Sequence, residues 1–252
     1  MTLHDWTHYF RSNQKTRLKV PPETYDLTPA ERRRITKSIQ SFQLGESSEG
    51  NILRLQARQQ SEQTGEPEYL EAIEHLIREE NWHSAYLAQF MRRHKIPRFK
   101  RGFNDTVFRF LRRLAGVELS CRVLVTAEVI AMTYYDCLAV ATNSPVLNLI
   151  CRKMCEEEKA HVDFQMFQIH RINLQKHALS GSLADIFHFL LTSFTLVPVW
   201  WEHRRVLQVK YSGFQFAAKV WRDFQNAMAD GQTQAAQSLI RAGLLRPEVL
   251  CT

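Results

Sequence analysis

Apolar residues recur at alternating spacings of three and four along most of this chain, which is the pattern of amphipathic helices with one buried face. Breaks in the pattern coincide with residues that start or stop helices, such as Thr28-Pro29, Gly65-Glu66-Pro67 and Asn143-Ser144-Pro145. Only nine Gly and eight Pro occur in 252 residues, which argues against a turn-rich all-β fold. The pattern predicts four long helices, over residues 29–61, 67–94, 104–142 and 145–178.

Two segments flank these four helices. Residues 1–27 are predicted to be an irregular arm packed by its aromatic side chains, Trp6, Tyr9 and Phe10. After a break at Ser180-Gly181-Ser182, three shorter helices are expected, over residues 183–207, 213–228 and 233–242. The prediction is an all-α protein made of an arm (1–27), a four-helix bundle (28–178) and a helical extension packed on the bundle (179–252).

The apolar seam of each long helix is interrupted by carboxylates, which are costly to bury unless they are paired or bind a metal ion. The second and fourth helices each carry a Glu-x-x-His pair, which places both side chains on one helix face. The first and third helices each supply glutamates without a histidine. The candidate metal ligands are Glu46, Glu80, His83, Glu128, Glu158 and His161.

The positions of these residues along the helices support a single site. In an antiparallel hairpin, residues equidistant from the turn lie side by side. Glu128 lies about as far before Ser144 as Glu158 and His161 lie after it. Glu118 lies a few helical turns further from Ser144 and is expected to pair with Arg122. For the first helix the same test leaves two candidates open, Glu46 and Glu49.

Further candidates have weaker support. Tyr134, Tyr135 and Tyr86 lie near the expected level of the site, where they would hydrogen-bond to it or serve as ordinary core aromatics. Asp163 is a candidate partner for a ligand histidine, which needs its second ring nitrogen oriented. His170 and His177 are expected to be exposed, and the cysteines are expected to be small buried side chains.

The chain resembles a known superfamily at these positions. The segment Phe42-Gln43-Leu44-Gly45-Glu46-Ser47 is similar to the Gly-Glu-Ser segment of rubrerythrin first helices, and the order Glu, Glu-x-x-His, Glu, Glu-x-x-His is similar to the ligand order of the ferritin-like superfamily. That superfamily includes ferritins, acyl-carrier-protein desaturases and aldehyde-deformylating oxygenases. The resemblance covers about residues 35–170 and implies a ferritin-like bundle with Glu46 as the first-helix ligand.

A site with four carboxylates and two imidazoles suits iron or manganese better than structural zinc. Two Fe ions are expected, with Fe/Mn or Mn as alternatives, and Glu46 and Glu128 are expected to bridge or chelate. The function expected is an O2-dependent oxidoreductase acting on an apolar or carrier-bound substrate. The alternatives are an iron-handling ferroxidase, storage or peroxide-detoxifying protein, and a bundle that binds no metal.

Charge and apolar composition suggest partners. Basic residues dominate Arg92–Arg113, where an acidic carrier or electron-donor protein would dock, although a solvated connector has the same composition. The most apolar window, residues 183–201, contains Asp185, His188 and Pro198, and it is expected to be a buried helix or tunnel wall rather than a membrane span. An odd number of cysteines and no leader predict a cytoplasmic protein, and a homodimer is an open possibility.

Overall fold

The computed structural model describes residues 1–47, 50–99, 116–174 and 178–246, and within these ranges the regular structure is entirely helical. The elements are α1 (Leu3–Asn13), a 3₁₀ turn η1 (Gln14–Thr16), α2 (Pro29–Glu46), α3 (Asn51–Thr64), α4 (Pro67–Arg93), α6 (Val117–Leu138), α7 (Pro145–Leu174), α8 (Ala178–Leu207) and α9 (Gly213–Arg241). The prediction of an all-α protein is confirmed.

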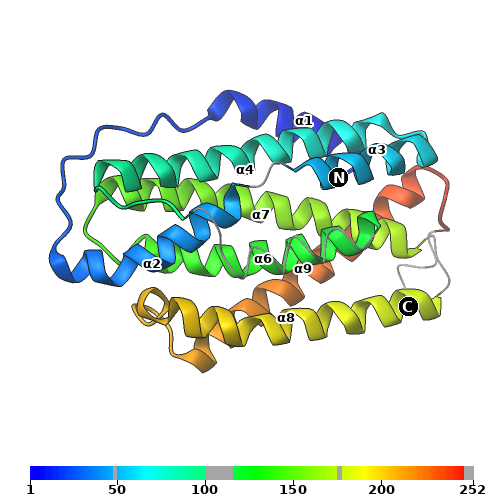
Figure 1. Ribbon diagram of the computed structural model, residues 1–252. Helices are drawn as coiled ribbons and strands as arrows, with labels where there is room; N and C mark the ends of the chain where they lie inside the picture. Colours follow the sequence, from blue (N-terminus) through cyan, green and yellow to red (C-terminus); the bar gives the residue numbers. More distant parts are fainter. Residues whose placement is uncertain (48–49, 100–115, 175–177, 247–252) are drawn as a thin grey trace.

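Four rows of helix form the bundle: α2 followed by α3, then α4, α6 and α7 (Figure 1). The remaining helices cover its outside. Helix α1 packs on α4, α8 packs on α6 and α2, and α9 packs along α7. This is a ferritin-like bundle with additional helices, as the sequence predicts.

The first bundle helix is broken, whereas the sequence analysis predicted one helix over 29–61. Helix α2 ends at Glu46 and α3 begins at Asn51, after Gly50. Gly50 has φ of 64°, in the left-handed region, and a Cβ atom there would lie 2.7 Å from a side-chain carbon of Ile77 on α4. The break places Glu46 at the end of a helix instead of in the middle of one.

The amino-terminal segment is more regular than predicted. Residues Leu3–Asn13 form a helix with a capping box, in which Thr2 and Asp5 each hydrogen-bond to the other's backbone. Trp6 and Phe10 are buried against Phe164 of α7, so the expected packing through aromatic side chains is confirmed. The capping box is readable in the sequence and was missed because only 11 residues follow it.

The carboxy-terminal helices are fewer and longer than predicted. Helix α8 begins at Ala178 and runs through the Ser180-Gly181-Ser182 segment that was expected to break it. Helix α9 is continuous from Gly213 to Arg241, where two helices were expected. Gly231 lies inside it because a Cβ atom there would lie 2.7 Å from Cβ of Met166 on α7, so this glycine permits close packing of the two helices.

Helix α8 also corrects the prediction of a buried apolar helix. It is long and apolar enough by length and composition to cross a membrane, yet only 22% of its apolar window is buried. Phe187, Phe189, Leu190, Phe194 and Trp201 are exposed. The outer face of α8 is therefore an apolar surface and not a tunnel wall.

The core consists of two apolar clusters, of which one runs along α6 from Cys121 to Leu138 and the other packs α1, α3 and the first half of α4 against α7. On α4, Ile73 and Ile77 belong to one cluster, and Leu87 and Phe90 belong to the other. The residues between them, Glu79 to Ser84, are the ones that break the apolar pattern. The polar candidates thus lie where the two clusters meet.

Candidate metal centre

The structure brings all six candidate ligands together between four helices. Glu46 comes from α2, Glu128 from α6, and the two Glu-x-x-His pairs come from α4 and α7. They form two groups, each with possible ligand atoms within 4.8 Å of one another: Glu46, Glu80, His83 and Glu158 in one, and Glu80, Glu128, Glu158 and His161 in the other. Glu49, the alternative first-helix ligand, lies outside the described residues.

The two groups share Glu80 and Glu158, and each group has one histidine and one carboxylate of its own. The sequence analysis left open whether Glu46 and Glu128 bridge or chelate, and each of them belongs to one group only. Two ions held by these groups would share Glu80 and Glu158 as ligands, and Glu46 and Glu128 would each bind one ion.

The polar atoms of this cluster are arranged for a ligand that donates no proton. Glu80 Oε1, His83 Nδ1, Glu158 Oε2 and His161 Nδ1 are buried and have no hydrogen-bond partner. The Nδ1 atoms nevertheless lie close to carboxylate oxygens, 2.9 Å from Glu80 in the case of His161 and 3.3 Å from Glu158 in the case of His83. Buried polar atoms that face one another without hydrogen bonds are the arrangement a metal ion would satisfy.

Electrostatics support the same conclusion. Burial, together with the charges of Glu80 and Glu158, raises the pKa of Glu46 well above its ordinary value. Burial and the charge of Glu158 likewise raise the pKa of Glu128. Burial also works against ionisation of Glu158, but the nearby imidazoles of His161 and His83 lower its pKa to about 2. Four carboxylates in this space cannot all ionise without cations, and two divalent ions would neutralise them.

Each histidine is oriented by a buried carboxylate from the opposite helix. His83 Nε2 lies 2.9 Å from Glu157 of α7, and His161 Nε2 lies 2.8 Å from Glu79 of α4. These contacts leave the Nδ1 atoms facing the cluster. Burial alone would lower the pKa of His83, but its hydrogen bond to Glu157 and its contact with Glu158 raise it well above its ordinary value. A carboxylate on the second nitrogen fixes the ring orientation of a ligand histidine.

Glu79 and Glu157 were missed in the sequence analysis, although a signal for them exists. Each immediately precedes a candidate ligand, so that Glu-Glu-x-x-His occurs on both helices, at Glu79–His83 and at Glu157–His161. Asp163, the residue expected to hold a histidine, instead pairs with Lys159 on the surface at 2.6 Å. That expectation was wrong because Asp163 lies on the outer face of α7.

The side of the cluster formed by α2 and α6 has different partners. The Tyr135 hydroxyl donates a hydrogen bond to Glu46, and the Gln165 amide donates to both oxygens of Glu128 at 2.6 Å. Of the three tyrosines considered from the sequence, Tyr135 alone has a hydrogen bond to a candidate ligand among the described residues. Tyr134 stacks on Phe42 and bonds to Ser38, and Tyr86 accepts from the backbone of Leu18.

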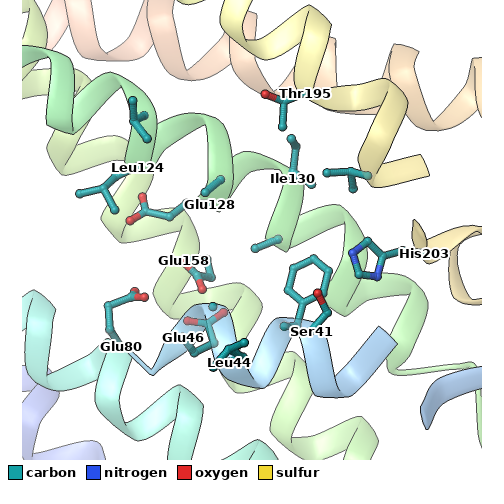
Figure 2. A pocket seen from close by; sticks show the side chains of 16 residues that line it. Ser41, Leu44, Glu46, Glu80, Leu124, Glu128, Ile130, Glu158, Thr195 and His203 are labelled. Atoms are coloured by element: carbon teal, nitrogen blue, oxygen red, sulfur yellow. The ribbon is translucent and has the colours of Figure 1, made fainter. Parts of the chain in front are cut away.

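A cavity of about 160 Å³ opens onto this same side. Its walls come from α2, α6 and the inner face of α8, and the four carboxylates lie at one end of it (Figure 2). Apolar side chains such as Leu44, Leu124, Ile130 and Val199 form most of the lining, and the polar residues away from the carboxylates are Ser41, Thr195 and His203. Cavities of this size hold molecules about as large as benzene.

Three other expectations concern residues outside the cluster. Glu118 accepts two hydrogen bonds from Arg122, at 3.1 and 3.0 Å, as predicted. His170, expected to be exposed, is buried. Cys121 and Cys137 are buried, in agreement with their expected role as small core residues, whereas Cys155, for which the same role was expected, is only partly buried.

The fold and the carboxylate–histidine cluster together define a ferritin-like protein with a candidate metal site. Among solved structures, the chain is similar to a Synechococcus protein described as protein 19 with aldehyde deformylating oxidase activity. The similarity has a TM-score of 0.60 with 15% sequence identity, and it covers 85% of this chain and 98% of the other. No protein-family model and no curated protein match the sequence. At this identity the likeness shows the fold.

Proposed function

We propose that this protein is a di-iron oxidoreductase that uses O2 to act on an apolar substrate. The observation that carries the proposal is the convergence of four carboxylates and two histidines, at the closed end of an apolar cavity, into two ligand groups that share two carboxylates. The six residues proposed as ligands are Glu46, Glu80, His83, Glu128, Glu158 and His161. Iron in such a site supplies two-electron chemistry with O2.

Some residues of the site would bind the ions, and others would orient the residues that bind them. Glu80 and Glu158 would join the two ions, and Glu79 and Glu157 would hold the histidine rings in place. On the cavity side, Tyr135 holds Glu46 and Gln165 holds Glu128, so both unshared carboxylates are fixed by a hydrogen bond. Apolar walls exclude bulk water from the end of the cavity, which protects reactive species from side reactions.

The substrate class follows from the shape and lining of the cavity. The apolar lining favours a hydrocarbon chain, whose reactive group would face the carboxylates. The structural neighbour is described as having aldehyde deformylating oxidase activity, which makes aliphatic aldehydes the first substrates to test. Carrier-bound acyl chains are the second class.

The basic residues at the end of α4 are proposed as the docking site for an acidic carrier or electron donor. Arg92, Arg93, Lys95 and Arg98 are exposed there, and the remainder of the basic run lies beyond the described residues. Replacing Arg92 and Arg93 with Glu should weaken reduction by an acidic donor protein and abolish its salt dependence. Unchanged salt dependence would exclude this surface.

The proposal is tested by metal loading followed by reaction with O2. The protein is expected to bind two Fe(II) per chain under anaerobic conditions, to consume O2 on mixing, and, with a chemical reductant supplied, to convert an aliphatic aldehyde to a product detectable by gas chromatography. Glu158→Ala should lose all of this. Glu156→Ala, an exposed glutamate of the same helix, should retain it. Uptake of many more than two irons per chain as mineral would favour iron storage, and binding of no metal would contradict the proposal.

A further inference from the structure

The last residue of α1 connects the two carboxylates that orient the histidines. The Asn13 amide nitrogen lies 2.8 Å from Oε1 of Glu79 and 3.0 Å from Oε1 of Glu157. Each carboxylate uses its other oxygen for a histidine, Glu79 for His161 and Glu157 for His83. One amide group from outside the bundle therefore links both histidines of the candidate metal centre.

The chemistry of this position requires an amide. Glu79 and Glu157 are 0% and 1% exposed, and two buried carboxylates in contact with one group would repel each other. The –NH2 of Asn13 offers two donors and spends one on each carboxylate. Its oxygen accepts from Thr16 Oγ1 at 2.7 Å and lies 3.3 Å from Lys153 Nζ, so every polar atom of the side chain is used.

Neighbouring groups support the amide without replacing it. Lys153 Nζ lies 2.9 Å from Oε1 of Glu157, and Gln14 donates to Glu79 at 3.2 Å. Each of these contacts only one of the two carboxylates. Asn13 is therefore the group that holds Glu79 and Glu157 at a fixed separation, and with them the two imidazoles, whose ring centroids are 5.7 Å apart.

We infer that Asn13 is a positioning residue of the metal centre, and that α1 is part of the site although it lies outside the four-helix bundle. This inference rests on the proposed metal-binding function. Loss of the amide should leave the helices in place and let the carboxylates move apart, so that the histidines no longer face the ions in a fixed orientation. Removing the carboxylate partner of a ligand histidine lowers metal affinity by about 10–100-fold. Removing the Asn13 amide should lower Fe(II) affinity by about tenfold.

The test compares Asn13→Leu and Asn13→Asp with Arg11→Ala. Arg11 lies on the same helix and makes a surface ion pair with Glu71 on α4, so its removal weakens α1 packing without touching the carboxylates. Fe(II) affinity is measured anaerobically by chelator competition, and the rise in Tm on Fe(II) loading is measured for each variant. A purely structural role of Asn13 would lower Tm equally with and without metal.

The expected result is weaker Fe(II) binding and a smaller metal-induced rise in Tm for both Asn13 variants, with normal values for Arg11→Ala. Asn13→Asp keeps the size of the side chain, so a result does not depend on Asn13→Leu folding well. Unchanged affinity in both Asn13 variants would overturn the inference while leaving the proposed function intact. Absence of Fe(II) binding by the unmodified protein would instead overturn the proposed function.

A second observation, independent of the metal centre, concerns the exposed face of α8. Apolar side chains recur there at alternating spacings of four and three, which is the repeat of a helix that packs along another helix. The most exposed are Phe194 at 74%, Val197 at 71%, Trp201 at 70% and Leu183 at 69%. The stripe consists of Leu183, Phe187, Leu190, Phe194, Val197 and Trp201.

The size of this stripe fits an interface between proteins. With aromatic side chains covering about 150–250 Å² each, the stripe and its neighbours Ile186 and Phe189 present roughly 700–900 Å² of apolar surface. The largest apolar patch of a typical monomer is about 300–600 Å², and a specific interface buries about 800 Å² per partner. The helix lies at the outer edge of the molecule, where a second chain can reach it (Figure 1).

We infer that a second copy of this chain covers the stripe, with the two α8 helices antiparallel. An antiparallel pairing centred near Thr192 sets Leu183 against Trp201, Phe187 against Val197 and Leu190 against Phe194 of the partner, so that each aromatic ring meets an aliphatic side chain. Helices that lie on a membrane surface carry Lys and Arg beside the apolar face. No Lys or Arg occurs between Ser182 and His203, which favours a protein occupant.

The test is the mass of the full chain in solution at micromolar concentration, by light scattering coupled to chromatography. The unmodified protein should be a dimer and Phe194→Glu a monomer. Leu55→Glu, at an exposed apolar position on α3, should remain a dimer. A chain carrying Leu183→Cys and Trp201→Cys should form a disulfide-linked dimer, and Leu183→Cys alone should not. A monomeric unmodified protein, or one that instead binds phosphatidylcholine vesicles through α8, would overturn the inference.

Discussion

The two sides of the candidate metal centre are built differently. On the side of α4 and α7, each histidine is held by a fully buried carboxylate, and Asn13 closes this side from outside. On the side of α2 and α6, Glu46 and Glu128 are each held by a single uncharged group, and the cavity begins there. Under the proposed function, the first side would fix the ions and the second would admit the substrate. The comparison shows that rigidity and access can be assigned to different pairs of helices.

The largest effect is expected from a carboxylate that belongs to both ligand groups. Glu158→Ala should abolish binding of both metal ions, because Glu158 contributes to each group. The measurement is iron per chain after anaerobic loading and desalting, with Glu156→Ala as the control on the same helix. Retention of one iron per chain would show that Glu158 does not bridge.

A smaller loss is expected from a carboxylate that belongs to one group. Glu128→Ala should reduce binding from two ions to one, because the group with Glu46 and His83 is left complete. Competition titration with a chelator should show one site of normal affinity and one lost. Loss of both ions would mean that the groups do not act separately and would place Glu128 with the bridging residues.

Substitutions on the side of α4 and α7 should lower Fe(II) affinity less than substitutions of the ligands do. Glu157→Gln should lower Fe(II) affinity by about 10–100-fold while stoichiometry at saturation stays at two, because His83 remains present but is held by an amide in place of a carboxylate. Gln165→Leu tests the side of α2 and α6, where the cavity begins, in the same assay. A larger loss of affinity for Gln165→Leu than for Glu157→Gln would reverse the proposed division between the two sides.

The smallest effect concerns pH. Burial raises the pKa of Glu46 and Glu128, and carboxylate neighbours raise the pKa of His83 and His161 against the opposing effect of burial. Groups whose pKa is raised by folding stabilise the fold below their ordinary pKa, and this stability is lost as pH rises through the raised value. The Tm of metal-free protein should therefore fall as pH rises above about 6.5, the ordinary pKa of histidine, and Fe(II) loading should reverse the trend. A metal-free Tm that rises over this range would contradict the assignment.

The sequence predicts the inner part of this molecule better than its outer part. The six candidate ligands were found because a buried helix face tolerates carboxylates only for a strong reason, so each one stands out against Leu and Ile neighbours. The sequence did not predict which carboxylates belong to both ligand groups, because spacing along one helix gives the level of a residue and not its distance from the other ligands.

The outer helices were predicted less well, for physical reasons that particular residues illustrate. Gly50 breaks the first helix because Ile77 leaves no room for a Cβ atom, a contact between distant residues that no local pattern contains. Gly181, a residue with the same local preference, lies inside α8 with nothing nearer than 3.8 Å to a Cβ atom. The contacts of Asn13 could not be predicted for the same reason, because its partners Glu79 and Glu157 lie far away in the sequence.

The crossed contacts of the histidines imply a near two-fold axis through the centre. The pattern Glu-Glu-x-x-His occurs once on α4 and once on α7, and each copy completes the other, which is the arrangement expected of a duplicated helical hairpin. Two ion positions related in this way would differ in the group that holds the unshared carboxylate, Tyr135 for Glu46 and Gln165 for Glu128. Any inequivalence of the two positions, in occupancy or in spectrum, should therefore become smaller when those two side chains are made alike.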